Sequence, residues 1–298
     1  MTRMIVSKHK VGKESPYDSI LGNFRNDLNV LKELNNKLAD SVENMRKESL
    51  RVVKEKVRSL DAEAQEELAE FVAGLKTPLP KNKKVVLEGK PAEIFWELTN
   101  EGFLVPNRFL MFIRDMGLVY LIAQYENFLR HTLEVTFSEK PEILSTCKKS
   151  VTFEQLMKFE SLDSVKEEII GKEASEVTNQ DVEEINDYFQ NKLNINISEC
   201  DEWEKFKERF CRRNVLIHNS GMPNEHYRKK TGYTGKNERL TVNKEYLDES
   251  IVMFENMASK LARDLKRKFK THSPHKQKSY VGSRKQRSKT PMPMSSET

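Results

Sequence analysis

Residues 108–137 read RFLMFIRDMGLVYLIAQYENFLRHTLEVTF and form the most hydrophobic segment of the chain. Leu, Phe, Ile and Tyr dominate this segment, and proline is absent from it. Apolar residues spread so widely around a helix predict one that is buried on more than one side. We therefore expect a long central helix here and, with it, an all-α fold.

Amphipathic patterns predict further helices on both sides of this segment. From Leu21 to Met45 the apolar residues recur at a three- and four-residue spacing, and Asn35 occupies the one polar core position. This spacing fits either a coiled coil that joins two subunits, with Asn35 setting its register, or a helix packed on its own domain. Helices are also expected at 52–75, 151–170, 179–193, 203–218 and 244–269, with a short one from Ile94 that ends near Gly102 and Pro106, and with turns at Gly171 and Asn194.

Breaks in these patterns divide the chain into five parts. Pro78 and Pro80 interrupt the helical pattern and indicate a linker. Beyond Phe269 no Leu, Ile or Phe occurs, so this end has little apolar surface to offset the entropy lost on ordering. We expect a flexible N-terminus at 1–16, an N-terminal helical unit at 17–77, a linker at 78–91, a helical bundle at 92–269 and a disordered basic tail at 270–298.

The charge of the chain is distributed unevenly. The 298 residues carry a formal net charge of +5, yet residues 260–298 hold twelve Lys or Arg against two acidic residues, a balance of +10 that leaves −5 on the rest. This asymmetry indicates a polyanionic partner held at one end. No apolar run approaches the roughly 20 residues of a membrane span, and no secretory signal is recognisable. We expect a cytoplasmic protein without a membrane partner.

Common enzyme signatures are missing from the sequence. It contains no phosphate-binding GxxxxGK[ST] loop, no GxGxxG, no HExxH and no GxSxG. The three cysteines include no CxxC pair. The seven- and eight-residue spacing of Cys211, His218 and His226 lacks a fourth ligand. The sequence therefore predicts neither a metal site nor a cofactor.

One segment does combine residues suited to chemistry. Residues 203–223 read WEKFKERFCRRNVLIHNSGMP, an amphipathic helix that Gly221 and Pro223 end. Asn214 and His218 are four residues apart and share a face of this helix. In the last turn the unpaired carbonyls favour a protonated imidazole, which suits a histidine that accepts and donates protons near neutral pH. Arg213 adds a permanent positive charge, and its guanidinium can donate two hydrogen bonds to one phosphate.

These residues resemble the HEPN (higher eukaryotes and prokaryotes nucleotide-binding) domains, all-helical modules whose ribonucleases carry an Arg-x(4–6)-His motif. Arg213-Asn-Val-Leu-Ile-His218 matches this motif, and Glu126-Asn-Phe-Leu-Arg130 matches the Glu-x3-(Lys/Arg/His) pattern of the first core helix in many of these families. On its residues alone, the second match also fits an ordinary ion pair between neighbouring helical turns. The resemblance covers about residues 92–269.

The resemblance implies metal-independent cleavage of RNA. The ribose 2′-OH attacks the adjacent phosphate and leaves a 2′,3′-cyclic phosphate, with Arg213, Asn214, His218, Glu126 and Arg130 as catalytic residues. It also implies a homodimer in which two motifs line one cleft, a toxin or antiviral defence role, and an inhibitor or regulatory protein as a further partner. For RNA binding we expect Arg212 and, in the loop after the motif, Lys229, Lys230 and Lys236.

Two other functions fit the same sequence. A non-catalytic helical module would bind a partner or sense a nucleotide, and it would not cleave RNA. An RNA-binding adaptor would depend on the basic tail alone, and it would lose RNA binding when residues 270–298 are removed.

Overall fold

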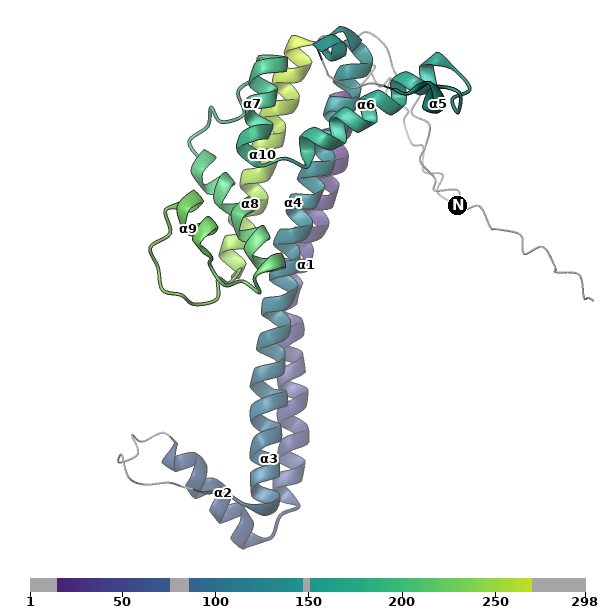
Figure 1. Ribbon diagram of the computed structural model, residues 1–298. Helices are drawn as coiled ribbons and strands as arrows, with labels where there is room; N and C mark the ends of the chain where they lie inside the picture. The colour runs from purple at the N-terminus through teal and green to yellow at the C-terminus, as the bar shows by residue number, and fades with distance from the viewer. Residues whose placement is uncertain (1–14, 76–85, 147–150, 270–298) are drawn as a thin grey trace, which may run out of the picture.

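The computed structural model describes residues 15–75, 86–146 and 151–269, and all regular secondary structure within these ranges is helical (Figure 1). The prediction of an all-α fold is confirmed. The predicted tail at 270–298, residues 1–14 of the predicted flexible N-terminus and most of the predicted linker lie outside the described residues. The elements are α1 (Pro16–Arg58), α2 (Ala62–Gly74), α3 (Gly89–Thr99), η1 (Asn100–Leu104), α4 (Val105–Glu139), η2 (Pro141–Thr146), α5 (Phe153–Leu156), α6 (Leu162–Thr178), α7 (Val182–Leu193), α8 (Trp203–His218), α9 (Glu225–Thr231) and α10 (Lys244–Lys268).

Two long helices, α1 and α4, lie antiparallel and side by side (Figure 1). Tyr17 at the start of α1 shares a hydrogen bond of 3.0 Å with Thr136 near the end of α4, and Arg46 near the end of α1 bonds Asn107 near the start of α4. One half of this pair belongs to a bundle with α6, α7, α8 and α10. The other half extends from the bundle as an arm, with α2 and α3 at its tip.

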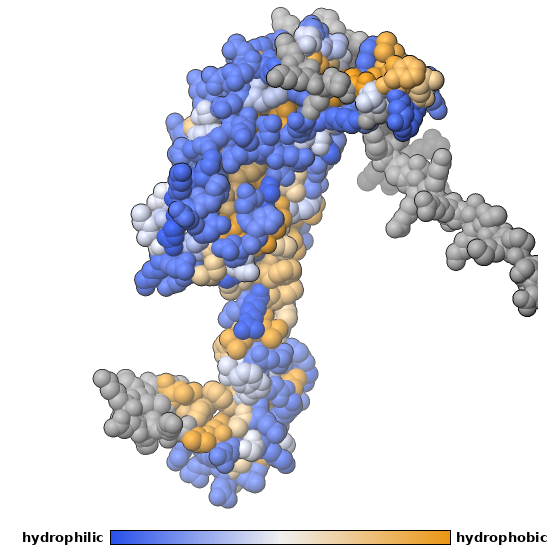
Figure 2. All heavy atoms as spheres, in the orientation of Figure 1, coloured by the Kyte–Doolittle hydropathy of each residue, from blue (hydrophilic) through white to orange (hydrophobic). Residues whose placement is uncertain are grey.

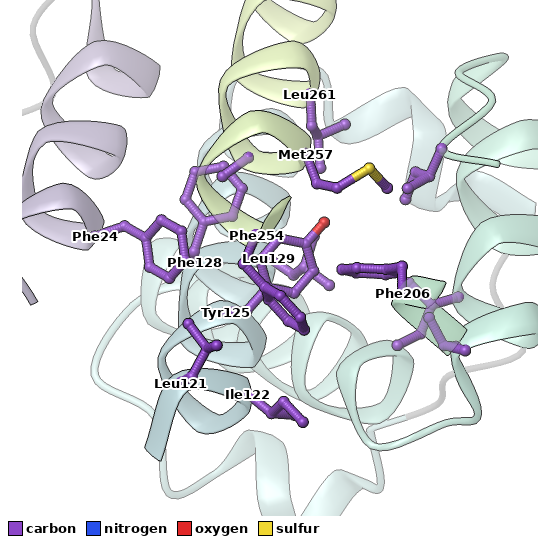
Figure 3. Packing of buried hydrophobic residues seen from close by; sticks show 14 of the residues in the cluster. Phe24, Leu121, Ile122, Tyr125, Phe128, Leu129, Phe206, Phe254, Met257 and Leu261 are labelled. Atoms are coloured by element: carbon purple, nitrogen blue, oxygen red, sulfur yellow. The ribbon is translucent and has the colours of Figure 1, made fainter. Parts of the chain in front are cut away.

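The helical bundle has an aromatic centre to which four helices contribute (Figure 3). Tyr125 of α4 and Phe254 of α10 have ring centroids 5.1 Å apart, and Phe206 of α8 lies 4.7 Å from Phe254. Phe24 of α1 packs on the same cluster, with its ring centroid 5.4 Å from that of Phe128. The N-terminal half of α1 is thus part of the bundle core, whereas the sequence placed all of 17–77 in a separate unit. The apolar stripe that begins at Leu21 is buried against α4 and α10 of its own chain.

Asn35, the polar residue in this stripe, is also satisfied within the chain. It is 1% exposed, and its Nδ2 donates to Asp248 Oδ1 at 2.9 Å and to the backbone oxygen of Lys244 at 3.3 Å. Its Oδ1 accepts from Arg114 Nε at 3.3 Å. Asn35 thereby connects α1 to both α4 and α10. All of these partners belong to the same chain, so Asn35 needs no second subunit to satisfy its hydrogen bonds.

The expected break near Pro106 is absent. α3, η1 and α4 follow one another directly from Gly89 to Glu139. η1 is a π-helical turn, and Pro106 lies in the first turn of α4. A proline needs no N–H partner at a helix start, and a wider π-type turn before it relieves the clash between its ring and the preceding carbonyl. The prediction that Gly102 and Pro106 end a helix is therefore wrong.

Other helix bounds agree more closely with the sequence, except that the helix expected at 151–170 is divided into α5 and α6 and continues to Thr178. α8 spans Trp203–His218 as predicted, and α10 ends one residue before the predicted end. The predicted turn at Gly171 is wrong, because this glycine lies within α6, while Asn194 does end α7 in a left-handed conformation with φ of 47°. None of the helices in the described ranges combines the length and hydropathy that a membrane span requires.

Candidate functional site

A partly buried carboxylate, that of Glu208, fixes the position of α8. Glu208 accepts four hydrogen bonds, and its side chain is 18% exposed. Burial acts to raise the pKa of Glu208, but the charge of Arg212, the two tyrosine hydroxyls and Arg209 outweigh that effect and leave the pKa below its ordinary value. The donors come from three helices: Tyr227 Oη of α9 at 2.6 Å, Tyr246 Oη of α10 at 2.6 Å, and Arg212 Nε at 2.7 Å and Arg209 Nη1 at 3.0 Å of α8 itself.

Arg212 belongs to this network. Its side chain is 15% exposed, Nη1 donates to the backbone oxygen of Thr241 at 2.9 Å, and the guanidinium lies 4.2 Å from the ring centroid of Tyr246. The sequence proposed Arg212 for RNA binding. In this structure its donors and its flat face are directed at α8, α10 and the loop before α10.

The next residue, Arg213, points to α4. Its Nη2 donates to Glu126 Oε1, an ion pair that joins residues 87 positions apart in the chain. The side chains are 22% and 30% exposed, so the pair is partly shielded from water. Burial raises the pKa of Glu126, and the charge and hydrogen bond of Arg213 lower it without cancelling that effect. The pair therefore brings together the two motifs that the sequence identified separately.

Arg130 lies one helical turn after Glu126. Its Nη2 donates to Asn127 Oδ1 at 3.1 Å, and its Nε is buried with no hydrogen-bond partner among the described residues. The carboxylate with which the sequence paired it, Glu126, bonds Arg213 instead. Arg130 is thus close to the Arg213 pair and keeps an unused donor.

The two remaining motif residues, Asn214 and His218, lie on the exposed side of α8. Between them, Val215 and Leu216 face the interior, and Ile217 is 46% exposed. His218 is in the last turn of α8, as the sequence predicts, and Gly221 follows with φ of 80°. The imidazole is therefore open to solvent at the end of the helix.

An apolar stripe on α4 lies at the same level as this helix end. α8 runs antiparallel to α4, because Arg213 pairs with Glu126, and Gly221 contacts Arg239, which pairs with Asp115. The stripe has the three- and four-residue spacing of one helical face, and Figure 2 shows apolar residues along the arm. We expected this helix to be buried on more than one side, whereas one of its apolar faces is open. The members of the α4 stripe are Val105, Phe109, Phe112, Met116 and Tyr120, each 37–58% exposed.

The three lysines proposed for RNA binding occupy different environments. Lys230 pairs with Glu183 and lies 3.6 Å from Asp181, which ties α9 to the start of α7. Lys229 is exposed. Lys236 has an 85% exposed side chain, 3.8 Å from Glu238. Lys229 and Lys236 are therefore the two of the three that present their charge to solvent.

Within the described ranges, no three His, Cys, Asp or Glu side chains lie close enough together to hold a metal ion. Cys211 is partly buried, and burial raises the pKa of its thiol to about 11. At neutral pH this thiol is therefore protonated and a poor metal ligand.

No protein-family model, curated protein or solved structure is significantly similar to this chain.

Proposed function

We propose that this protein is a metal-independent endoribonuclease of the HEPN type that acts as a toxin or antiviral defence effector. The observation that carries the proposal is the ion pair between Glu126 and Arg213. It sets the arginine of the Arg-x4-His motif beside the Glu-x3-Arg pattern, at the end of a helix whose histidine is exposed. If each pattern were only a local surface feature, nothing would require residues 87 positions apart in the chain to form an ion pair.

The roles follow from the chemistry of the side chains. Arg213 stabilises the negative charge that grows on the phosphate as the 2′-OH attacks, because a guanidinium is always charged and binds phosphate through two donors. His218 transfers a proton near neutral pH, and Asn214, one turn away on the same face, orients the imidazole or the substrate. Glu126 positions Arg213, and Arg130 supplies a further cation beside the pair.

The proposed reaction needs a second proton carrier. The 2′-OH loses a proton as its oxygen bonds to phosphorus, and the departing 5′-oxygen gains one. Each chain has one histidine at the end of α8. We therefore include a homodimer in the proposal, with two copies of the motif in one cleft. The α4 stripe supports this arrangement, because it is an exposed apolar surface at the level of His218.

Cleavage of a mixed RNA substrate in EDTA tests the proposal. We expect wild type to give products with a 2′,3′-cyclic phosphate and a 5′-OH, and Arg213→Ala and His218→Ala to lose at least a hundredfold in rate. His226→Ala, an exposed histidine on α9, and Arg51→Ala, an exposed arginine on α1, are the matched controls. Cleavage that persists unchanged in both motif variants would contradict the proposal.

A helical interaction module is the second candidate function, and the α4 stripe also favours it. An exposed row of aromatic and aliphatic side chains is a common binding surface for another helix. In that case wild type cleaves no RNA, and overexpression in cells affects neither growth nor RNA integrity.

A further inference from the structure

The side chain of Arg239 lies on the segment that follows the α8 histidine. Gly221 comes three residues after His218, and a Cβ there would stand 2.9 Å from Arg239 Cγ and 3.2 Å from its Nε. The backbones are joined as well, since Leu240 N–H donates to the Gly221 oxygen at 2.8 Å. Gly221 combines a left-handed φ with this close approach, and either feature favours glycine. The position is therefore shaped to receive Arg239.

A buried carboxylate holds the guanidinium of Arg239. Arg239 Nη2 donates to Asp115 Oδ2 at 2.6 Å. Asp115 is 3% exposed, and its other oxygen has no hydrogen-bond partner among the described residues. A buried carboxylate without a cation is strongly unfavourable, so Arg239 is the cation that offsets the burial of Asp115. The pair connects the loop before α10 to α4.

The remaining side of the guanidinium is open. The Arg239 side chain is 39% exposed, and the bond to Asp115 is its one hydrogen bond to the described residues. A guanidinium has five N–H donors, and the bond to Asp115 uses one of them. Because its position is already fixed, binding an anion there costs little further side-chain entropy. A surface arginine on a flexible loop would lose more side-chain entropy when it binds an anion.

Arg213 and Arg239 lie on either side of His218. Arg213 comes five residues before the histidine, about 7.5 Å along the helix axis, and Arg239 contacts Gly221 three residues after it. A strand whose scissile phosphate is at Arg213 and His218 would thus bring a neighbouring phosphate to Arg239. The sequence does not indicate this position for Arg239, because its partner Asp115 is 124 residues away.

We propose that Arg239, held by Asp115, binds a backbone phosphate adjacent to the one that is cleaved. This inference rests on the proposed ribonuclease function. It makes Arg239 a substrate-positioning residue without sequence preference, since phosphates are the same at every nucleotide.

Binding of a short single-stranded RNA with 2′-O-methyl riboses tests the inference, because this probe lacks the attacking hydroxyl. Arg239→Gln should weaken binding about tenfold at low salt, as expected for one charge-assisted contact. It should also reduce the slope of log K against log salt by about 0.7, the value for one phosphate contact on a single strand. On a cleavable RNA, KM should rise and kcat should stay within twofold. Arg51→Gln, which removes an exposed arginine paired with Glu48 on α1, should change neither binding quantity.

A second pair of variants separates charge from folding. Arg239→Gln alone leaves Asp115 buried without its cation, whereas Asp115→Asn with Arg239→Gln removes both charges. Asp115→Asn alone keeps the Arg239 charge. We expect the double variant to show the same reduction in salt slope as Arg239→Gln, and Asp115→Asn to keep the wild-type slope. A purely structural role would lower the melting temperature in each case and leave the slope at the wild-type value.

The outcomes distinguish this inference from the proposed function. If wild type cleaves RNA and the salt slope of Arg239→Gln equals that of wild type, the phosphate site is wrong and the ribonuclease proposal stands. If wild type binds the probe and cleaves no RNA, the ribonuclease proposal fails, and the slope still decides whether Arg239 contacts phosphate. If wild type does not bind the probe at all, both are overturned.

Discussion

Replacement of Glu208 by Gln should be among the most damaging single substitutions in the bundle, although it changes one atom. The carboxylate accepts from four donors, two of them arginines. A glutamine oxygen can accept from two of these donors. Its NH2 group then faces an arginine, with which it cannot bond, and a tyrosine hydroxyl, which would have to accept instead of donate. Each buried donor left without an acceptor costs about 1–3 kcal/mol, and breaking a buried ionic pair costs about 3–5 kcal/mol in total.

Urea denaturation followed by circular dichroism measures this loss. We expect Glu208→Gln to lower the free energy of unfolding by about 4 kcal/mol and the melting temperature by about 10 °C, since 1 kcal/mol corresponds to roughly 2–4 °C in a domain of this size. Glu204→Gln is the matched control, because Glu204 is one turn earlier on α8 with a 78% exposed side chain and a single lysine partner. Its substitution should change stability by under about 0.5 kcal/mol.

The difference should also depend on pH. The folded state holds the pKa of Glu208 below its ordinary value of 4.5, so the unfolded chain takes up the proton first on acidification. The advantage of wild type over Glu208→Gln is therefore complete above pH 4.5 and decreases as pH falls through the lower folded pKa. A difference of less than 1 kcal/mol at pH 7, or one that grows on acidification, would refute the assignment of Glu208 as the ionic centre of α8.

Three further substitutions test other parts of the structure. Asn35→Ala should lower the free energy of unfolding by about 2–4 kcal/mol in chemical denaturation, because partly buried donors and acceptors on α4 and α10 lose their partner. Gly221→Ala should lower the melting temperature by several degrees through a strained φ and the contact with Arg239, with a cost of about 1–3 kcal/mol; calorimetry that finds no change would exclude that close approach. Phe112→Glu should shift the mass from dimer to monomer in light scattering if the α4 stripe joins two copies, whereas Lys205→Glu, an exposed substitution on α8, should leave the mass unchanged.

The fold class and most helices could be predicted because they depend on local patterns. α8 has an amphipathic spacing with a glycine and a proline after it, and both signals act within a few residues. Pro106 misled the prediction because its effect depends on its place in a helix. A proline breaks a helix interior and is tolerated in a first turn, and the π-helical turn that makes Pro106 acceptable has no sequence signature.

The residues of the candidate site could be predicted from the sequence, but their ion-pair and hydrogen-bond partners could not. Arg213, His218 and Glu126 each stood out by type and spacing, but nothing local indicated that Glu126 would pair with Arg213 and not with Arg130. Arg212 looked like a free cation because its acceptor, the Glu208 network, depends on tyrosines from α9 and α10. Asp115 is a buried acidic residue in an apolar helix. An acidic residue in such a position needs a cationic partner, and this was the one indication in the sequence of its bond to Arg239.

The bundle core has a consequence for the order in which the chain is made. α1 and α4 are synthesised early and can pair through their own apolar faces, yet the aromatic centre at Tyr125 also needs Phe206 of α8 and Phe254 of α10. During synthesis this centre stays exposed until α10 leaves the ribosome, since domains complete their cores only when all contributing elements are present. The last described helix, α10, also carries Tyr246, which completes the hydrogen bonds to Glu208 on α8, the helix of the Arg213–His218 motif. A nascent chain that has already released Arg213 and His218 therefore holds them on an unfinished helix bundle, and α8 gains its final geometry only after α10 has been synthesised.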